Sequence, residues 1–231
     1  MSAGGPGAVV ELLGAPGAGK SGLASALAAL DGVAVVKDHQ PSDRLALAWS
    51  MVRSCNVALA PPPNVDRRRW ASWAARVGAS RHVARSRIAL GARIVVFDQG
   101  AAYTLVRMLQ LRRRPPGNHW WAERCIDTAR LLDLVVLVDA DTATLEGRLR
   151  SRRKHHHADE LDPGALRSYV EAERRNCHEV ADALVREGAE AIRLVTTELS
   201  VEDQVTRVQE ALAGVHRTLD MPAHPPSRSK R

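Results

Sequence analysis

The chain has 231 residues, a length that suits one α/β domain, and 45% of them are hydrophobic, enough for a sizeable core. Its formal net charge is +7, and it has only three cysteines, whose wide spacing argues against a zinc ribbon or a disulfide framework. No apolar run approaches the roughly 20 residues that span a bilayer, and the first residues lack the layout of a signal peptide. We therefore expect a cytoplasmic protein with no membrane association.

Short apolar runs alternate with helical patterns along the chain. The runs predict buried strands at 9–13, 33–36, 94–97, 134–138 and 191–195. Helices are predicted at 21–30, 43–59, 70–90, 101–111, 118–132, 142–153, 163–187 and 201–212. This alternation predicts an α/β fold in three layers, with a five-stranded parallel sheet covered by helices on both faces.

Capping residues precede several of the predicted helices. Asp141, Asp162 and Ser200 can each accept hydrogen bonds from the first backbone amides, and Pro163 suits a first helical position. Residues 1–214 are expected to form one folded domain. The basic tail 215–231 contains three prolines and is expected to be disordered.

The most specific motif follows the first predicted strand. GAPGAGKS at 14–21 matches GxxxxGK(S/T) at every fixed position. Glycines let successive N–H groups turn inward as an anion nest, and the following helix directs its positive end at the same phosphates. Lys20 is expected to reach the β- and γ-phosphates of ATP, and the Ser21 hydroxyl to bind Mg²⁺. The predicted nucleotide site comprises Gly14, Ala15, Pro16, Gly17, Ala18, Gly19, Lys20, Ser21 and Gly22.

A competing pattern lies inside the same segment. Residues 17–22 also fit GxGxxG, and Asp38 follows the next strand, as in a dinucleotide-binding unit. Pro16 and the longer spacer extend the loop beyond a tight strand-to-helix turn. A Lys–Ser pair is required by a triphosphate site and is incidental to a dinucleotide site, so the triphosphate interpretation is favoured.

Two predicted strands end in an aspartate. Asp98 follows the strand at 94–97, and Asp139 follows the strand at 134–138. An aspartate in this position can hold Mg²⁺ through its water ligands, as a Walker B acid does, although many strands end in aspartate for turn chemistry alone. The pattern by itself leaves both candidates open.

Arginines are concentrated in the predicted helix at 142–153. Arg148 and Arg152 are four residues apart, so we expect them to share a helical face. A solvated charged face is one interpretation. The favoured one is a lid at about 146–161, whose guanidinium groups neutralise charge on the transferring phosphoryl group while closure excludes water.

These segments together resemble the thymidylate-kinase-like branch of the P-loop nucleoside and nucleotide kinases. The strongest match is GAPGAGKS at 14–21, followed by GARIVVFDQG at 91–100 and LVVLVDADTATLEGRLRSRR at 134–153. The resemblance covers roughly residues 9–212 and implies a sheet order of 2-3-1-4-5. It favours Asp98 over Asp139 as the Walker B acid, and it makes 43–90 the acceptor-side helices.

The resemblance also implies how an acceptor would be used. Asp38 lies where related nucleoside kinases keep an acidic base that takes a hydroxyl proton. Candidates for contacts to the acceptor are Trp49, Arg53, Trp70, Trp73 and Arg76. The family's usual arginine after the acid of the third strand is replaced by Gln99, which weakens the case for a nucleoside monophosphate and leaves open a nucleoside, a sugar or an antibiotic.

The predicted function is transfer of the γ-phosphoryl group of ATP, with Mg²⁺, to a nucleoside, a nucleotide or a similar hydroxyl compound. The predicted catalytic residues are Lys20, Asp38, Asp98, Arg148 and Arg152, and the predicted metal-binding residues are Ser21 and Asp98. A polynucleotide 5′-end kinase and a non-catalytic ATP-binding regulatory protein stay open as alternatives. The expected partners are ATP and a small-molecule acceptor; nucleic acid is less favoured, and a homodimer is left open.

Overall fold

The computed structural model describes residues 7–37, 66–110, 118–152 and 157–219. Its strands are β1 (Ala8–Leu13), β2 (Val33–Val36), β3 (Ile94–Phe97), β4 (Leu134–Asp139) and β5 (Ala191–Val195). Its helices are α1 (Lys20–Ala28), α4 (Arg67–Ala89), α5 (Ala101–Gln110), α6 (Asn118–Ala129), α7 (Thr142–Ser151), the 3-10 helix η2 (His157–Glu160), α8 (Pro163–Arg186) and α9 (Val201–Leu219).

The five strands form one parallel sheet in the order β2-β3-β1-β4-β5, which confirms the predicted order. The central strand β1 pairs with β3 on one side and with β4 on the other. A dinucleotide-binding unit has the order 3-2-1-4-5, so the sheet counts against that alternative. The pairing also brings the carboxyl ends of β1, β3 and β4 to the same edge.

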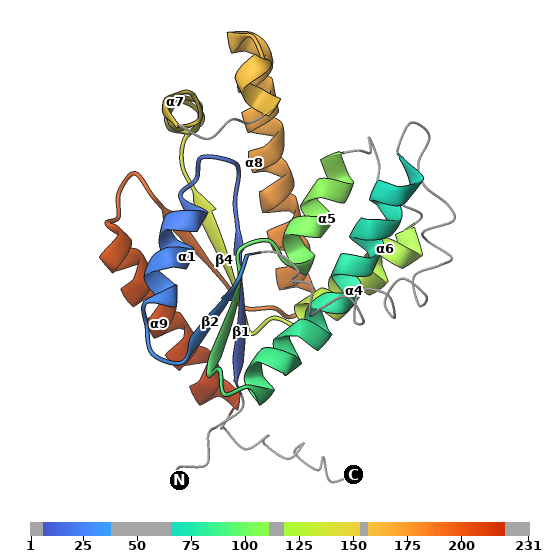
Figure 1. Ribbon diagram of the computed structural model, residues 1–231, viewed down its shortest axis with the longest axis vertical. Coiled ribbons are helices and arrows are strands. Elements are labelled where there is room, and N and C mark those ends of the chain that lie inside the picture. The colour runs from blue at the N-terminus through green and yellow to red at the C-terminus, as the bar shows by residue number, and fades with distance from the viewer. Residues whose placement is uncertain (1–6, 38–65, 111–117, 153–156, 220–231) are drawn as a thin grey trace, which may run out of the picture.

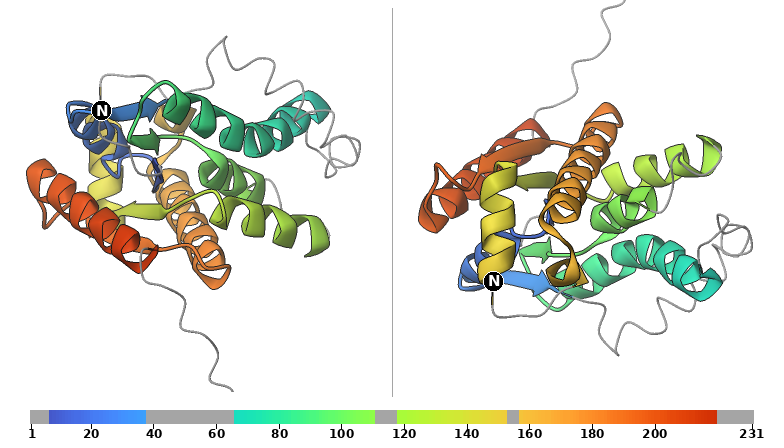
Figure 2. Two further views of the ribbon diagram at one scale, coloured as in Figure 1. Left: turned by 90° about the horizontal axis from the view of Figure 1, so that it is seen from below. Right: turned by 90° about the horizontal axis from the view of Figure 1, so that it is seen from above.

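Helices cover both faces of the sheet, as predicted. Helices α1 and α9 pack together on one face, while α4, α5, α6 and α8 cover the other (Figures 1 and 2). Successive side chains of β1 point to opposite faces of the sheet and pack in two hydrophobic cores. Val9 and Leu13 pack in the core with α5 and α8, whereas Val10 and Leu12 pack in the core with α1 and α9. Burial on both faces explains why the strands are continuous apolar runs.

The predicted helix caps are confirmed. The Asp141 carboxylate accepts the Thr144 N–H at 2.9 Å, and the Asp162 carboxylate accepts the Ala165 N–H at 2.9 Å. The Ser200 hydroxyl likewise accepts an N–H from the first turn of α9. Each side chain satisfies an amide that has no partner inside its own helix.

Several helix ends differ from the prediction; for example, α4 begins at Arg67 rather than at 70, and α6 ends at Ala129 rather than at 132. Helix α7 ends at Ser151 because Arg152 has an extended backbone, with φ −74° and ψ 144°. Helix α9 continues past residue 212 to Leu219. The predicted helix at 43–59, the tip of the predicted lid and most of the basic tail lie outside the described residues. No helix in the described ranges is long and apolar enough to cross a membrane.

Candidate nucleotide and acceptor site

The phosphate-binding loop connects β1 to α1 at the carboxyl edge of the sheet. Gly19 is the N-cap of α1 and has φ 102°, a conformation that side chains disfavour. A Cβ atom at Gly14 would collide with the carbonyl oxygen of Val138 on the neighbouring strand. The glycines therefore allow the loop to turn tightly against β4 and lead into the positive end of α1, as an anion site requires.

The Lys20 side chain folds back on the phosphate-binding loop. Its Nζ donates to the Gly14 carbonyl at 2.6 Å and to the Ala15 carbonyl at 3.2 Å, and it lies 5.8 Å from the centre of the Tyr103 ring. Burial lowers the pKa of Lys20, while nearby acidic groups that include Asp98 oppose this shift. The ammonium group is thus held at the loop, within side-chain reach of any phosphate bound there.

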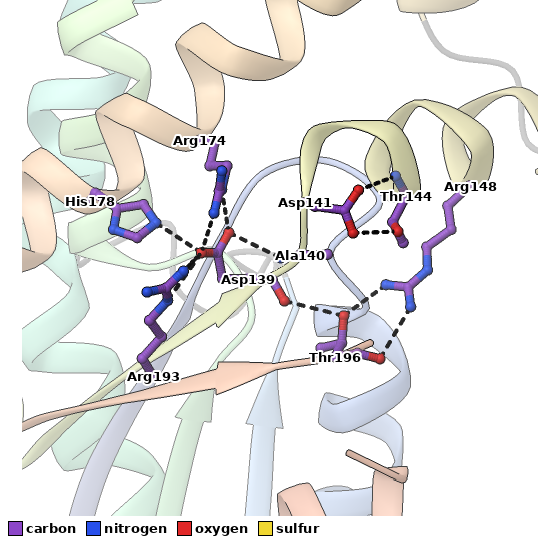
Figure 3. A network of polar contacts seen from close by, with 9 residues as sticks. All are labelled: Asp139, Ala140, Asp141, Thr144, Arg148, Arg174, His178, Arg193 and Thr196. Atoms are coloured by element: carbon purple, nitrogen blue, oxygen red, sulfur yellow. Dashed lines mark hydrogen bonds and ion pairs between the residues drawn. The ribbon is translucent and has the colours of Figure 1, made fainter. Parts of the chain in front are cut away.

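The structure separates the two candidate acids. Asp139 is 3% exposed and its carboxylate accepts hydrogen bonds from Arg174 at 2.7 and 3.0 Å and from Arg193 at 2.6 and 3.1 Å (Figure 3). His178 Nε2 lies 3.1 Å from the same carboxylate. Asp98 is also buried, but its Oδ1 has no hydrogen-bond partner within the described residues. Asp98 therefore offers the free carboxylate oxygen that a hydrated Mg²⁺ ion would fit.

The charge of Asp139 is strongly stabilised. Burial alone would raise the pKa of Asp139, but the hydrogen bonds from Arg174 and Arg193 lower it to about 2. The carboxylate connects the end of β4 to α8 through Arg174 and to β5 through Arg193. These contacts give Asp139 a structural role.

Arg148 extends from α7 to the phosphate-binding loop (Figure 3). Its Nη1 donates to the Gly17 carbonyl at 3.3 Å and to the Thr196 hydroxyl at 2.8 Å, and its Nη2 donates to the Thr196 carbonyl at 3.2 Å. The side chain thus bridges α7, the loop and the turn after β5. Both terminal nitrogens have protein acceptors in this arrangement.

Arg152 has a different setting. The expectation that it shares a helical face with Arg148 was wrong, because α7 has ended before it. Its Nε and Nη2 are buried and have no hydrogen-bond partner in the described part of the chain. Unpaired buried guanidinium donors fit an oxyanion such as a phosphate oxygen.

A cavity of about 270 Å³ lies beside the loop on the acceptor side. It is lined by side chains of α4, α5 and the residue after Asp98, namely Arg69, Trp73, Arg76, Gln99, Tyr103, Thr104 and Arg107. Tyr103 also approaches Lys20, so the cavity adjoins the loop. Two of the proposed acceptor contacts, Trp73 and Arg76, are in this lining.

The other proposed acceptor residues lie elsewhere. Trp70 is fully buried and packs with Trp73 and Met108, so it belongs to the core. Asp38, Trp49 and Arg53 lie outside the described residues, and nothing in the structure bears on the role of Asp38 as a base.

Sequence reasoning missed an acid next to the cavity. Glu173 of α8 is fully buried, and its Oε1 accepts a hydrogen bond from Arg107 at 3.1 Å. Burial raises the pKa of Glu173, and the charge of Arg107 opposes the shift. Glu173 is one of several acids on α8, and no feature of the sequence distinguishes it from them.

Sequence reasoning also missed Glu11, although its position in the sequence is unusual. It is an acid inside an apolar strand, and a buried carboxylate requires compensating hydrogen bonds. Its Oε1 accepts the N–H groups of Gly100 at 3.0 Å and Tyr103 at 2.7 Å, and its Oε2 accepts that of Ala102 at 3.0 Å. Glu11 therefore fixes the start of α5, the helix that carries Tyr103 and Arg107.

Solved structures with the same fold include three of deoxyadenosine kinase from M. mycoides. One with bound dATP is 15% identical with a TM-score of 0.54, and one with dCMP and a flexible dCDP is 14% identical with a TM-score of 0.52. A third, with bound dCTP, is 15% identical with a TM-score of 0.50. Each alignment covers 89% of this chain and 99% of the other.

Sequence comparison adds no closer relative. No family model matches the chain, and no curated protein sequence is significantly similar to it. The three-dimensional similarity establishes the fold, which this chain shares with the structures of deoxyadenosine kinase.

Proposed function

We propose that this protein is a P-loop phosphotransferase that moves the γ-phosphoryl group of ATP to a hydroxyl of a small molecule, such as a nucleoside. The observation that carries the proposal is the glycine-rich loop with Lys20 held against it. Beside the loop lie a polar cavity and the buried Asp98 Oδ1, which accepts no hydrogen bond from any described residue. The structures of deoxyadenosine kinase with bound nucleotides support a nucleotide as a ligand of this fold.

The residues of the loop have distinct roles in this proposal. Backbone N–H groups of 15–20 and the N-terminus of α1 would bind the phosphates. Lys20 would exchange the carbonyls of Gly14 and Ala15 for phosphate oxygens. Mg²⁺, when bound, would offset phosphate charge, and Ser21 together with Asp98 would hold it.

Arg148 and Arg152 would have different roles in the lid. Arg148 would keep α7 against the loop, since it already bonds the Gly17 carbonyl and Thr196. Arg152 would direct Nε and Nη2, from which no described residue accepts a hydrogen bond, at the transferring phosphoryl group, where charge develops. Asp38, by the family resemblance, would take the proton of the acceptor hydroxyl.

Replacing Lys20 by Ala tests the mechanism. We expect kcat/KM for ATP-dependent transfer to fall by about 10³-fold or more, because the loop loses the cation that stabilises the transferring group. ATP consumption would be measured with nucleosides, nucleoside monophosphates, sugars, aminoglycoside-like compounds and a 5′-hydroxyl oligonucleotide as acceptors. The matched control is Lys37→Ala, an exposed lysine after β2.

The outcome separates the candidate functions. Unchanged turnover in Lys20→Ala with an intact melting transition would rule out this mechanism. ATP binding by the wild-type protein without turnover of any acceptor would favour the regulatory alternative. Turnover of the oligonucleotide alone would favour the end-kinase alternative.

A further inference from the structure

Three arginines line the cavity beside the phosphate-binding loop. Arg69 and Arg76 come from α4, and Arg107 comes from α5. Positions 69, 73 and 76 fall on one face of a helix because they are four and seven residues apart. Helix α4 therefore presents Arg69, Trp73 and Arg76 together to the same space.

Among the described residues, one of the three arginines has an acidic partner. Arg107 is paired with Glu173 at 3.1 Å. The Arg69 guanidinium lies 5.0 Å from the centre of the Trp73 ring, and neither Arg69 nor Arg76 forms an ion pair with any described residue. The lining of the cavity thus carries two guanidinium groups that form no ion pair with an acid in the described part of the chain.

The described residues that line the cavity include no acid. Residues 38–65 contain two aspartates and two arginines, so they add no formal net charge wherever they lie. A half-buried guanidinium such as that of Arg76 is stabilised by an anion, and its planar fork matches the two oxygens of a carboxylate or phosphate.

We propose that the acceptor is itself an acid: a compound with a hydroxyl that receives the phosphoryl group and a separate carboxylate or phosphate monoester held by Arg76 and Arg69. This inference rests on the proposed function. The cation–π contact with the Trp73 ring, at 5.0 Å from the ring centre, holds the Arg69 guanidinium at the cavity lining. Gln99 also lines the cavity but carries no charge, so in this proposal the arginines of α4 bind the anion.

Anion binding to the cavity can be measured without knowing the acceptor. The phosphate-binding loop is first saturated with Mg²⁺ and a non-hydrolysable ATP analogue, so that only the cavity remains available. Inorganic phosphate or acetate is then titrated at constant ionic strength, and tryptophan fluorescence is followed because the Arg69 guanidinium lies 5.0 Å from the centre of the Trp73 ring. A Trp73→Phe variant checks that the signal comes from the cavity.

We expect a saturable fluorescence change with at least one of the two anions. The dissociation constant should rise about tenfold in Arg76→Gln and in Arg69→Gln, because a bidentate charged hydrogen bond is lost. It should be unchanged in Arg81→Gln, the same substitution at an exposed position of α4 outside the cavity. A response to phosphate alone identifies a phosphate monoester, and a response to acetate identifies a carboxylate.

Turnover provides a second readout. Hydroxy acids are compared with their amides, and sugar phosphates with the free sugars, and we expect at least one charged compound to exceed its neutral partner about tenfold in kcat/KM. That preference should vanish in Arg76→Gln and persist in Arg81→Gln.

The proposal is overturned if the wild-type protein shows no saturable response to either anion, or if Arg76→Gln and Arg81→Gln respond alike. Preference for every neutral compound would also overturn it. Failure of the proposed function is distinguishable, because Lys20→Ala removes phosphoryl transfer while the anion response of the cavity remains.

Discussion

Glu11 places a carboxylate in the middle of the central strand, where no water reaches it. Burial raises the pKa of Glu11 to about 7, although the amides of Tyr103, Ala102 and Gly100 oppose the shift. Three backbone donors around one carboxylate make it the anchor of α5. The residue thus links the sheet to the helix that lines the proposed acceptor cavity.

The raised pKa of Glu11 predicts a specific pH dependence. Between about pH 4.5 and 7 the folded protein keeps a proton that the unfolded chain releases, so this group's contribution to the free energy of unfolding falls as pH rises. The glutamine in Glu11→Gln cannot ionise, so the free energy of unfolding of this variant does not fall with pH for that reason. We expect its stability deficit relative to wild type to shrink by on the order of 2 kcal/mol from pH 4.5 to 8, measured by urea denaturation. A deficit that stays constant with pH would contradict the assignment.

The free oxygen of Asp98 predicts a catalytic effect without a loss of stability. We expect Asp98→Asn to lower kcat by about 100-fold, because the carboxylate proposed to hold the hydrated Mg²⁺ ion is replaced by a neutral amide. Its melting temperature should stay near that of wild type, since no described hydrogen bond to Oδ1 is lost. Steady-state kinetics across Mg²⁺ concentrations would check this, and an unaffected kcat would remove Asp98 from the metal site.

At the scale of elements, Asp139 fastens the end of β4 to α8 and to β5. The folded-state pKa of about 2 lies below the ordinary value of 3.8, so the stability from this group is complete above pH 3.8 and is lost as pH falls toward 2. After solvent screening at the partly exposed arginines, this contribution is on the order of 1 to 2 kcal/mol.

Asp139→Asn is therefore expected to behave in the opposite way from Asp98→Asn. It should lower the free energy of unfolding at pH 7 by about 2 kcal/mol, because two arginines lose their buried partner. The loss relative to wild type should diminish below pH 3.8. Denaturant melts at pH 7 and pH 3 test both statements, and equal deficits at the two pH values would contradict them.

Helix α7 is positioned through Arg148, which spans the loop and the turn after β5. Arg148→Lys keeps the charge but cannot reach the Gly17 carbonyl and both Thr196 oxygens at once. We expect the KM for ATP to rise about tenfold, since the loop loses its contact with α7. Arg150→Lys, at an exposed position of the same helix, is the matched control. Equal effects of the two substitutions would show that Arg148 has no special role.

At the scale of the whole molecule, the proposed site depends on the parallel sheet. Loops that follow β1, β3, β4 and β5 lie at one edge of the sheet, where Arg148 contacts both Gly17 and Thr196. Part of the net charge of +7 belongs to residues 220–231, which contain three basic residues and one aspartate.

Truncation after Leu219 tests what the tail charge does. We expect binding of single-stranded oligonucleotides to weaken and to become less dependent on salt, because phosphate-neutralising cations have been removed. Phosphoryl transfer to the small-molecule acceptor should be unchanged. Salt-dependent oligonucleotide binding that survives truncation would instead support the nucleic-acid alternative.

Local patterns determined the elements that depend only on neighbouring residues. The apolar runs predicted all five strands, and the caps at Asp141 and Asp162 fixed two helix starts, because these signals act within a few residues. The phosphate-binding loop is equally local, since its glycines and Lys20 form one continuous segment. The resemblance added the order of the strands.

Tertiary structure decided which charged groups are free and which are paired. Asp98 and Asp139 look alike in sequence, and only the approach of Arg174 and Arg193 from α8 and β5 distinguishes them. Glu173 reaches Arg107 across 66 positions of the chain. Such pairings depend on how elements that are far apart in the sequence pack together. The composition of the chain and the spacing of its residues do not reveal which side chains this packing brings into contact.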